Sequence, residues 1–420
     1  MKNIIWIFVI SFVFRFFISF VAWHPDVNNH IDWGIRFFEY GAKKFYAPET
    51  NVWSYTWPNQ PPGTMYMFAG IRKVFEAVFA GFWWINIHVP AFPSGIITFF
   101  ETNLYPALLK LPSILADLGI GYLIYKLTKK RFAVLLWLIN PVVWYNSAVW
   151  GQYDSVVSFF ALSSFYLLLQ KKLTFSLLAL VFSFYIKASL LIFAPIWLIV
   201  ALRQKYNFGK WFLAICFSLL VISLLTLPFS YGNPLIWLFE LYQKKIFVQQ
   251  LHIITANAFN LWAGLTGIHE RPDIYRLWGY ILFSVSYIPL LISIFRKPTS
   301  RNLFWVLALT AFSSFMLLTN MHERYLYPLF PYLTILVSLN LISLYPYILI
   351  SLVSLLNLYN FWWVPRIDFL VNFLSFGNRL MPRVFGFINF ILFLQLCKEY
   401  FLQNLSPRKG GQQGGLRRGR

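Results

Sequence analysis

The sequence predicts an all-α, polytopic membrane protein with about twelve transmembrane helices. Hydrophobic residues make up 59% of the 420 residues and charged residues only 12%, whereas a soluble chain is about 25% charged. Mean hydropathy is +0.62, and apolar runs close to the length of about 20 residues that crosses a bilayer follow one another along the chain. Aromatic residues, at 21%, suit side chains that lie at the headgroup level. This composition excludes an ordinary soluble enzyme.

The first apolar run is expected to stay as a membrane anchor, because no small-residue cleavage pattern follows it. Lys187 interrupts the stretch 173–202, which is too long for one span and too short for two full ones, so two short helices are expected to meet there. Run length and helix breakers give these spans: 3–23, 107–127, 132–149, 154–170, 173–186, 188–202, 210–229, 274–295, 302–320, 328–344, 346–363 and 382–401.

The chain is expected to form one polytopic domain over residues 1–405. A large outer loop, 23–105, contains two short apolar patches at 65–71 and 74–87 that are separated by charged residues. These patches are expected to be helices in the membrane interface, with a membrane-crossing hairpin as the alternative. The segment 406–420 is rich in Gly, Gln and Arg, and is expected to be a disordered basic tail against anionic lipid.

The formal net charge of +21 is carried by short segments between the apolar runs. Such basic loops, here 128–131, 171–172, 203–210 and 296–301, are typical of the cytoplasmic side. Both termini are therefore expected to be cytoplasmic. No soluble domain carries a basic face, so no nucleic-acid partner is expected. The outer loops lack glycosylation sequons, which favours the cytoplasmic membrane of a prokaryote over the endoplasmic reticulum.

In this topology the unusual polar residues collect at the outer ends of the spans. An ionisable residue at the membrane edge is costly unless it is paired or lines a polar cavity, so a single pocket roofed by the first outer segment is expected. The residues concerned are His24, Asp26, Asp32, Lys110, Gln152, Asp154, Lys187, Asn257, Asn260, His322, Glu323 and Arg324.

Each of these residues also has a structural interpretation. Asp26 and Asp154 are each placed to cap the helix that follows them. Lys187 is long enough to snorkel, and the triplet 322–324 is able to form an ion-pair cluster. Arg15 and Asp117 are expected to hold helices together inside the bundle.

An ordered set of motifs runs through about residues 15–330. The motifs are His24-Pro-Asp26, Trp33, Gly41, Phe45-Tyr46, Gln60-Pro-Pro-Gly-Thr-Met-Tyr66, Lys110-Leu-Pro-Ser-Ile-Leu-Ala-Asp117, Asn140-Pro141, Trp150-Gly-Gln-Tyr-Asp-Ser155, Asn257-Ala-Phe-Asn-Leu-Trp262 and Met321-His-Glu-Arg-Tyr-Leu-Tyr-Pro328. Together they resemble the GT-C glycosyltransferases, and most closely their PIG-V-like branch, relatives of the second mannosyltransferase of GPI-anchor synthesis.

The resemblance implies inverting transfer of a hexose, expected to be mannose, from a polyprenyl-phosphate donor to an acceptor hydroxyl at the outer face. An acid of the first outer loop is then the base, and Asp26 occupies that place. Asp32 follows six residues later, about 600° around a helix of 3.6 residues per turn, so it is expected to point away from Asp26. The aspartate that precedes the Pro-Pro pair in some relatives is absent, since Trp57-Pro-Asn-Gln stands there.

The residues expected to bind substrate are His24, Lys110, Gln152, Asp154, Lys187, Asn257, His322, Glu323 and Arg324. The lysines and Arg324 suit the negative charge of a phosphate leaving group.

Three points stay open in the sequence. A transporter or flippase of lipid-linked glycans also needs many spans and polar residues, although it would more often show repeats and discontinuous helices at the bilayer centre. A structural scaffold would leave the polar cluster unexplained. The acceptor is not identified, and no metal-ligand spacing is found, although a divalent cation as a cofactor stays open.

Overall fold

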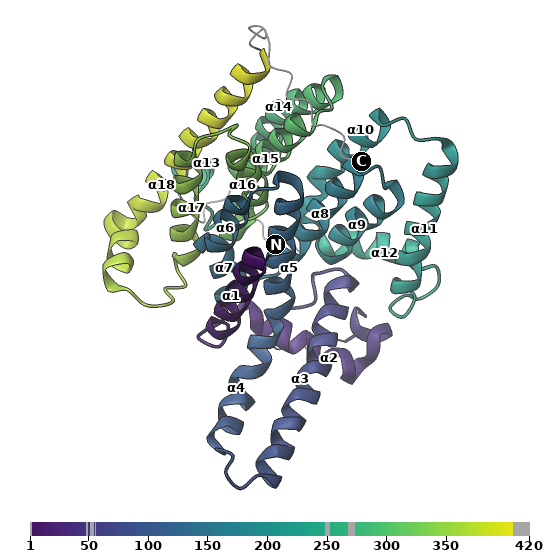
Figure 1. Cartoon of the computed structure of the whole chain (residues 1–420), viewed down its shortest axis with the longest axis vertical. Helices are drawn as coiled ribbons and strands as arrows, with labels where there is room; N and C mark the ends of the chain where they lie inside the picture. The colour runs from purple at the N-terminus through teal and green to yellow at the C-terminus, as the bar shows by residue number, and fades with distance from the viewer. Residues whose placement is uncertain are drawn as a thin grey trace.

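The computed structural model describes residues 2–47, 49–50, 54, 56–247, 253–267 and 274–405, and this part of the chain is helical almost throughout (Figure 1). The basic tail expected at 406–420 lies outside the described residues. The all-α prediction is therefore confirmed for the described part of the chain, with one two-stranded pairing as the exception.

The N-terminal part of the chain consists of α1 (Lys2–Ile18), α2 (Asp26–Phe45), α3 (Pro62–His88), α4 (Gly95–Leu109) and α5 (Leu111–Thr128). Helices α3 and α4 form a hairpin that projects away from the bundle at the lower end of Figure 1.

The hairpin differs from the expected pair of short helices. The patches at 65–71 and 74–87 belong to one helix, α3, of 27 residues. The charges that separate the patches do not break it, because Glu76 pairs with both Arg72 and Lys73 one turn earlier on the same helix. Such pairs at spacings of three and four residues stabilise a helix.

The middle part contains shorter helices with breaks between them. It consists of α6 (Arg131–Ile139), α7 (Pro141–Trp144), the π-helix η1 (Tyr145–Trp150), α8 (Asp154–Leu169), α9 (Leu173–Ile186), the 3-10 helix η2 (Ala188–Phe193), α10 (Ala194–Arg203), α11 (Phe208–Thr226), α12 (Pro234–Leu241) and the π-helix η3 (Tyr242–Ile246).

Two of these breaks have a clear local cause. At the α6–α7 break, the Asn140 side chain accepts the backbone N–H of Val142 and Pro141 occupies the first position of α7. Pro at this position and Asn as cap are a common start of a new helix. At Lys187 the backbone is extended (φ −158°, ψ 130°), which confirms the expected junction of two short helices.

The C-terminal part begins with a short strand and ends with a long helix. It consists of β1 (Thr255–Ala256), α13 (Leu261–Leu265), α14 (Ile274–Arg296), α15 (Ser300–Leu317), β2 (Met321–His322), the 3-10 helix η4 (Glu323–Leu326), α16 (Leu329–Ser338), α17 (Leu344–Tyr359) and α18 (Asp368–Leu405). Non-helical residues 376–379 interrupt α18.

Several helices have the properties of membrane spans. Four described stretches are long and apolar enough to cross a bilayer, namely Gly95–Thr128, Phe208–Thr226, Ile274–Arg296 and Asp368–Asn404. A fifth is added if Arg131–Ile139 and Pro141–Trp150, bent by 51°, count as one broken span. Other expected spans coincide with apolar helices of 10–17 residues, so the chain has the character of a polytopic membrane protein without the full set of twelve long spans.

Helix α8 packs closely against both α5 and α9 in the middle of the bundle, and α1 and α6 pack against α5. Helix α15 is buried from Asn302 to Leu317. The loops after α1, η1 and α9, together with the segment between α15 and α16, meet at one end of this core, and this meeting point holds most of the predicted polar residues.

Candidate functional site

Asp26 is the first residue of α2, and its side chain does not cap that helix. Its Oδ2 atom accepts a hydrogen bond from Gln152 Nε2 at 2.8 Å and lies 3.3 Å from Nη1 of Arg324. The Asp26 side chain is 33% exposed, whereas that of Arg324 is 14% exposed. Two residues far away in the sequence thus hold the carboxylate, which remains reachable from outside.

The charges around Asp26 keep it ionised. Burial alone would raise the pKa of Asp26, but the Arg324 guanidinium and His24 outweigh burial and hold this pKa well below its usual range. For Arg324, burial acts to lower the pKa, but Asp26 together with Tyr325, Glu323 and Asp154 more than compensates, so its pKa is raised. At neutral pH the pair is therefore a carboxylate facing a guanidinium.

Glu323 contacts the same nitrogen of Arg324 as Asp26 does. Its carboxylate is 3.2 Å from Arg324 Nη1 and is almost fully buried. Burial raises the pKa of Glu323, although the positive charge of Arg324 acts in the opposite direction. Arg324 therefore contacts two carboxylates at once, and its Nε atom has no hydrogen-bond partner within the described chain.

Aromatic rings bring the segment before α2 against the end of η1. The backbone N–H of His24 donates to the carbonyl of Trp150 at 3.0 Å, and the two rings stack with centroids 4.1 Å apart. Trp362, which follows α17, packs edge-on against both rings. The buried Trp150 Nε1 has no hydrogen-bond partner among the described residues.

Gly151 lets the chain turn sharply between Trp150 and Gln152. Its φ is +85°, and a Cβ atom there would lie 2.7 Å from Val27 Cγ2 and 3.2 Å from Lys110 Cγ. A residue with a side chain would be strained in this conformation and would also clash. Glycine at this position therefore permits the close approach that brings Gln152 to Asp26.

His322 and Asn257 are brought together by a short strand pairing. Strands β1 and β2 run parallel, with Ala256 opposite His322, and a further bridge joins Asn257 to His322. The Asn257 side chain is already occupied, since it donates to the Asn360 carbonyl and accepts from the Asn360 amide. We assign Asn257 to the support of this loop.

A second buried charge pair lies between α8 and the junction of α9 with η2. Lys187 Nζ is 2.6 Å from Asp154 Oδ1, and the two side chains are 8% and 5% exposed. The Lys187 ammonium also lies near the rings of Tyr153 and Tyr325, 5.4 and 4.9 Å from their centroids. The side chain of Lys187 is therefore buried and paired, and Asp154 does not cap its helix.

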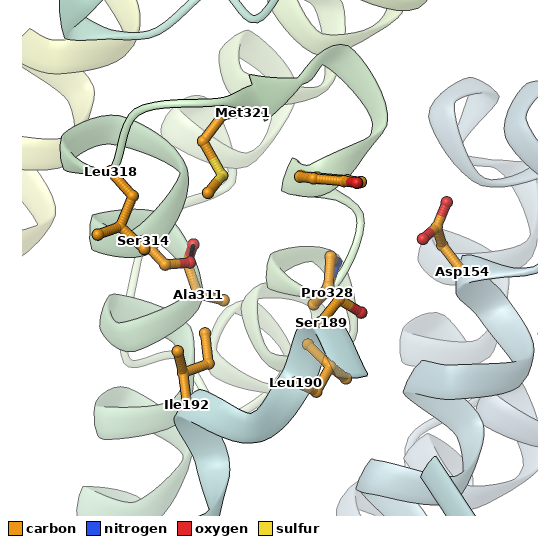
Figure 2. Close-up of a pocket in the computed structure, with 10 residues that line it drawn as sticks. Asp154, Ser189, Leu190, Ile192, Ala311, Ser314, Leu318, Met321 and Pro328 are labelled. Carbon is orange, nitrogen blue, oxygen red and sulfur yellow. Dashed lines mark hydrogen bonds between the residues drawn. The ribbon is translucent and has the colours of Figure 1, made fainter. Parts of the chain in front are cut away.

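A cavity of about 110 Å³ lies beside this pair (Figure 2). Asp154 is at its edge, and Asp154 Oδ2 has no hydrogen-bond partner in the described chain. Most of the other wall residues are apolar and come from η2, α15 and the start of α16. The cavity is lined by Asp154, Ser189, Leu190, Ile192, Ala311, Ser314, Leu318, Met321, Tyr325 and Pro328.

Lys110 is not available in the way the sequence predicts. Its ammonium is fully buried and donates to the carbonyls of Ser19 and Ala22 at 2.6 and 2.5 Å. These carbonyls follow the last turn of α1, where orphan acceptors are usual. Lys110 therefore fixes the chain that leads into Asp26, and the structure does not place its charge beside Arg324.

Asp32 also serves a local purpose. Its carboxylate accepts from the backbone N–H of Ser54 at 3.0 Å and lies 3.3 Å from Arg36 Nε. It thus holds part of the outer loop.

His30 is a site residue that sequence reasoning missed. It lies one turn after Asp26 on α2, is 4% exposed, and stacks on Phe68 with centroids 4.3 Å apart. Burial lowers its pKa to about 3, against the opposite effect of Asp26. The spacing of four residues from Asp26, which puts both on one helix face, is the signal that could have found it.

His322 has the same charge state. Burial lowers its pKa to about 3, and the neighbouring Arg324 acts in the same direction. Both histidines are therefore neutral at pH 7 and are able to donate and accept hydrogen bonds.

Another buried polar network lies deeper in the bundle. Asp117 accepts hydrogen bonds from the hydroxyls of Ser147 and Tyr327, each at 2.5 Å, and lies 3.5 Å from Arg15 Nε. These residues come from α5, η1, the end of η4 and α1. The expectation that Arg15 and Asp117 hold helices together is confirmed by these contacts.

Among the described residues no group of three or more His, Cys, Asp or Glu side chains is arranged to hold a metal ion. Comparison of the sequence with models of known protein families gives no match, and no curated protein matches it.

Proposed function

We propose that this protein is a glycosyltransferase that moves a hexose, expected to be mannose, from a polyprenyl-phosphate donor to an acceptor hydroxyl. The observation that carries this proposal is the setting of Asp26. A partly exposed carboxylate is held by Gln152 and Arg324, which come from separate segments. A base for the acceptor and a cation for a phosphate thus lie side by side.

The reaction is a single displacement with inversion. The acceptor oxygen forms a bond to the anomeric carbon as its proton passes to Asp26. The bond between that carbon and the phosphate oxygen breaks, and the lipid phosphate leaves with the electron pair. A carboxylate within hydrogen-bond reach suits the first requirement, and a buried guanidinium suits the growing charge of the leaving group.

The contacts of Arg324 support an order of events. Without substrate its charge is shared between Asp26 and Glu323. A donor phosphate at Arg324 would take part of this interaction, so the pKa of Asp26 would rise toward its ordinary value and Asp26 would become a better base. Lys187 is the second cation proposed for the donor, with Asp154 Oδ2 free to accept a sugar hydroxyl.

The architecture proposed with this activity has about twelve spans and cytoplasmic termini in the cytoplasmic membrane of a prokaryote. Residues 1–405 would then form one domain, with the site at the outer face. The meeting of the loops after α1, η1 and α9 at one end of the bundle supports this arrangement, because these loops alternate with basic connections such as 128–131 and 171–172.

The test is the transfer of labelled mannose from polyprenyl-phosphate mannose in membranes that contain the wild-type protein or the Asp26→Asn variant. Loss of a general base typically lowers the rate about 10²–10⁴-fold, and that loss is expected at unchanged protein level. Asp368→Asn is the matched control, because Asp368 is 77% exposed and pairs only with Arg366 in the described chain. Full activity of Asp26→Asn would remove Asp26 as the base.

A flippase or transporter of lipid-linked glycans is the second candidate. It is favoured by the broken span at Asn140-Pro141 and by the extended backbone at Lys187, because transporters often use discontinuous helices. Proteoliposomes with a fluorescent polyprenyl-phosphate sugar separate the two candidates. A flippase would change the accessibility of the label without moving the sugar to another molecule.

A further inference from the structure

The deep network around Asp117 is connected to three segments that lead to the Asp26 site. Asp117 is fully buried in α5 and accepts from two hydroxyls, while its backbone carbonyl accepts from Trp137 Nε1 at 2.8 Å. A buried ionisable group inside a membrane bundle is costly and needs partners. Its partners here come from three separate segments, and each segment ends at a residue that contacts or precedes Asp26.

The first connection runs through Tyr327 to Arg324. The Tyr327 hydroxyl donates to Asp117 Oδ1, and the Tyr327 backbone N–H donates to the Arg324 carbonyl at 3.0 Å. The second runs through Ser147 in η1. Its hydroxyl donates to Asp117 Oδ2, and the neighbouring Asn146 carbonyl accepts the N–H of Gln152 at 3.1 Å.

The third connection runs through Arg15 in α1. Arg15 lies 3.5 Å from Asp117 and donates to the Leu138 carbonyl at 2.9 Å. One turn later the carbonyl of Ser19 accepts from Lys110, and the chain then continues to His24 and Asp26. The Asp117 carboxylate therefore fixes the positions of α1, η1 and η4 relative to one another.

We propose that Asp117 is a positioning residue of the site: through Tyr327 and Ser147 it sets where Arg324 and Gln152 stand relative to Asp26. The effect of Asp117 on catalysis rests on the proposed function. The effect of Asp117 on the positions of Arg324 and Gln152 does not depend on that function. A displacement of about 1 Å in such an arrangement is enough to slow a reaction by about 10²-fold, so the expected effect lies in kcat.

Tyr327→Phe is the sharpest variant, because it removes one hydroxyl and keeps the buried ring. Tyr347→Phe is the matched control. Tyr347 is also a buried tyrosine of the bundle, and its hydroxyl bonds to Asn140 and to the Leu136 carbonyl. Its hydroxyl partners in the described chain are Asn140, Thr334 and Leu136 rather than Asp117, so the control breaks an equivalent network away from the site.

The first measurement needs no substrate. Infrared difference spectra against Asp26→Asn, taken between pH 7 and 3, report the protonated carboxyl of Asp26. The charged and titratable groups that face Asp26 come from α2, the loop before it, the residue before α8, β2 and η4, and they are His30, His24, Tyr153, His322, Glu323 and Arg324. In the wild type, Arg324 keeps Asp26 ionised through this range, so its protonated band is expected to be absent.

In Tyr327→Phe a looser Arg324 lets the Asp26 pKa rise toward its ordinary value of about 4, so the protonated band is expected to appear between pH 5 and 3. Tyr347→Phe is expected to behave as the wild type. A merely structural role of the network would lower the thermal stability of both variants alike and leave the band absent in both. That result would overturn the proposal.

The second measurement is transfer kinetics with polyprenyl-phosphate mannose. Tyr327→Phe and Ser147→Ala are expected to lower kcat at least tenfold with donor KM changed less than threefold, and Tyr347→Phe is expected to change neither. If the wild type transfers no sugar, the proposed function fails while the infrared result still decides the positioning role. An active wild type with an unchanged Tyr327→Phe variant refutes the positioning role alone.

Discussion

Lys187 and Asp154 show how opposite charges are kept at the edge of an apolar bundle. They are 2.6 Å apart and almost fully buried. Removing one partner of a buried pair leaves an uncompensated charge and typically costs about 3–5 kcal/mol. We therefore expect Asp154→Asn and Lys187→Met each to lower thermal stability in detergent strongly. The double variant is expected to recover much of the loss, because both charges are then absent.

The exposed pair Glu240–Lys244 is the control for this double-mutant cycle. Its side chains are 50% and 67% exposed, and such surface pairs contribute about 0–1 kcal/mol. The same cycle in transfer assays separates stability from chemistry. If Lys187 holds the donor phosphate, the stable double variant stays inactive, whereas an active double variant would assign the pair to structure. Strictly additive losses would show that the two side chains do not interact.

His30 leads to a prediction on pH dependence. Burial lowers its pKa in the folded protein to about 3, whereas in the unfolded chain it is about 6.5. Above about pH 6.5 both states are neutral at this residue. Below it the unfolded chain binds a proton that the folded protein does not, so the free energy of unfolding falls as pH decreases from about 6.5 toward 3.

The slope expected from this one group is about 1.4 kcal/mol per pH unit. His30→Gln, which cannot take up the proton, is expected to flatten the fall in melting temperature between pH 6 and 4. His88→Gln is the matched control, because His88 is exposed at the tip of the hairpin. Equal acid sensitivity in wild type and His30→Gln would contradict the neutral, buried state of His30.

At the scale of the elements, the turn at Gly151 determines how η1 leads into α8. Gly151→Ala is expected to destabilise the protein, because a left-handed conformation costs a non-glycine residue about 1–2 kcal/mol and the new Cβ meets Val27 at 2.7 Å. The displaced Gln152 is expected to lower transfer as well. Gly70→Ala in α3 is the control, since its Cβ meets nothing within 4 Å and alanine favours a helix. A Gly151→Ala protein as stable as wild type would contradict this account.

The break at Lys187 could be predicted from sequence because its cause is local, whereas the break at Asn140-Pro141 lies inside the expected span 132–149 and was not predicted. Lys187 interrupts an apolar stretch, and this signal indicated the junction that the structure contains. The pairing of β1 with β2 could not be predicted, since two-residue strands carry no periodic pattern and their partners are far apart in the chain. Helix α3 was expected in two pieces because charged residues separate its apolar patches, but it is continuous because the charges of Arg72 and Glu76 are paired within the helix itself.

At the scale of the whole molecule, the membrane topology explains why part of the site was predictable. Polar residues at span ends stand out in an apolar chain, and this signal predicts a common site for Asp26, Gln152 and Arg324. The structure shows that these side chains are in contact. The signal does not show what each side chain bonds to. The sequence pattern therefore does not distinguish Lys110 from Lys187, although the partners of Lys110 are backbone carbonyls.

Labelling of introduced cysteines with a membrane-impermeant maleimide tests the topology itself. In a background with Cys216 and Cys397 replaced by serine, Lys172→Cys and Glu240→Cys place single thiols at exposed positions. An inside loop at 171–172 and an outside loop after α11 predict that only the thiol at 240 reacts in intact cells. The thiol at 172 is expected to react after permeabilisation. Labelling of both positions from the same side would refute the orientation derived from the basic loops.

The hairpin of α3 and α4 is the remaining question of topology, and His88→Cys at its tip decides it. Helix α4 continues through Lys110 into α5 as a single run of 34 residues. At 1.5 Å per residue this run is about 51 Å long, well over the hydrocarbon thickness of about 30 Å. If α5 crosses the bilayer, α4 must then extend beyond the outer face, and the thiol at 88 reacts in intact cells. Reaction only after permeabilisation would mean that the hairpin crosses the membrane, and Asp26 would then need a different position relative to the bilayer.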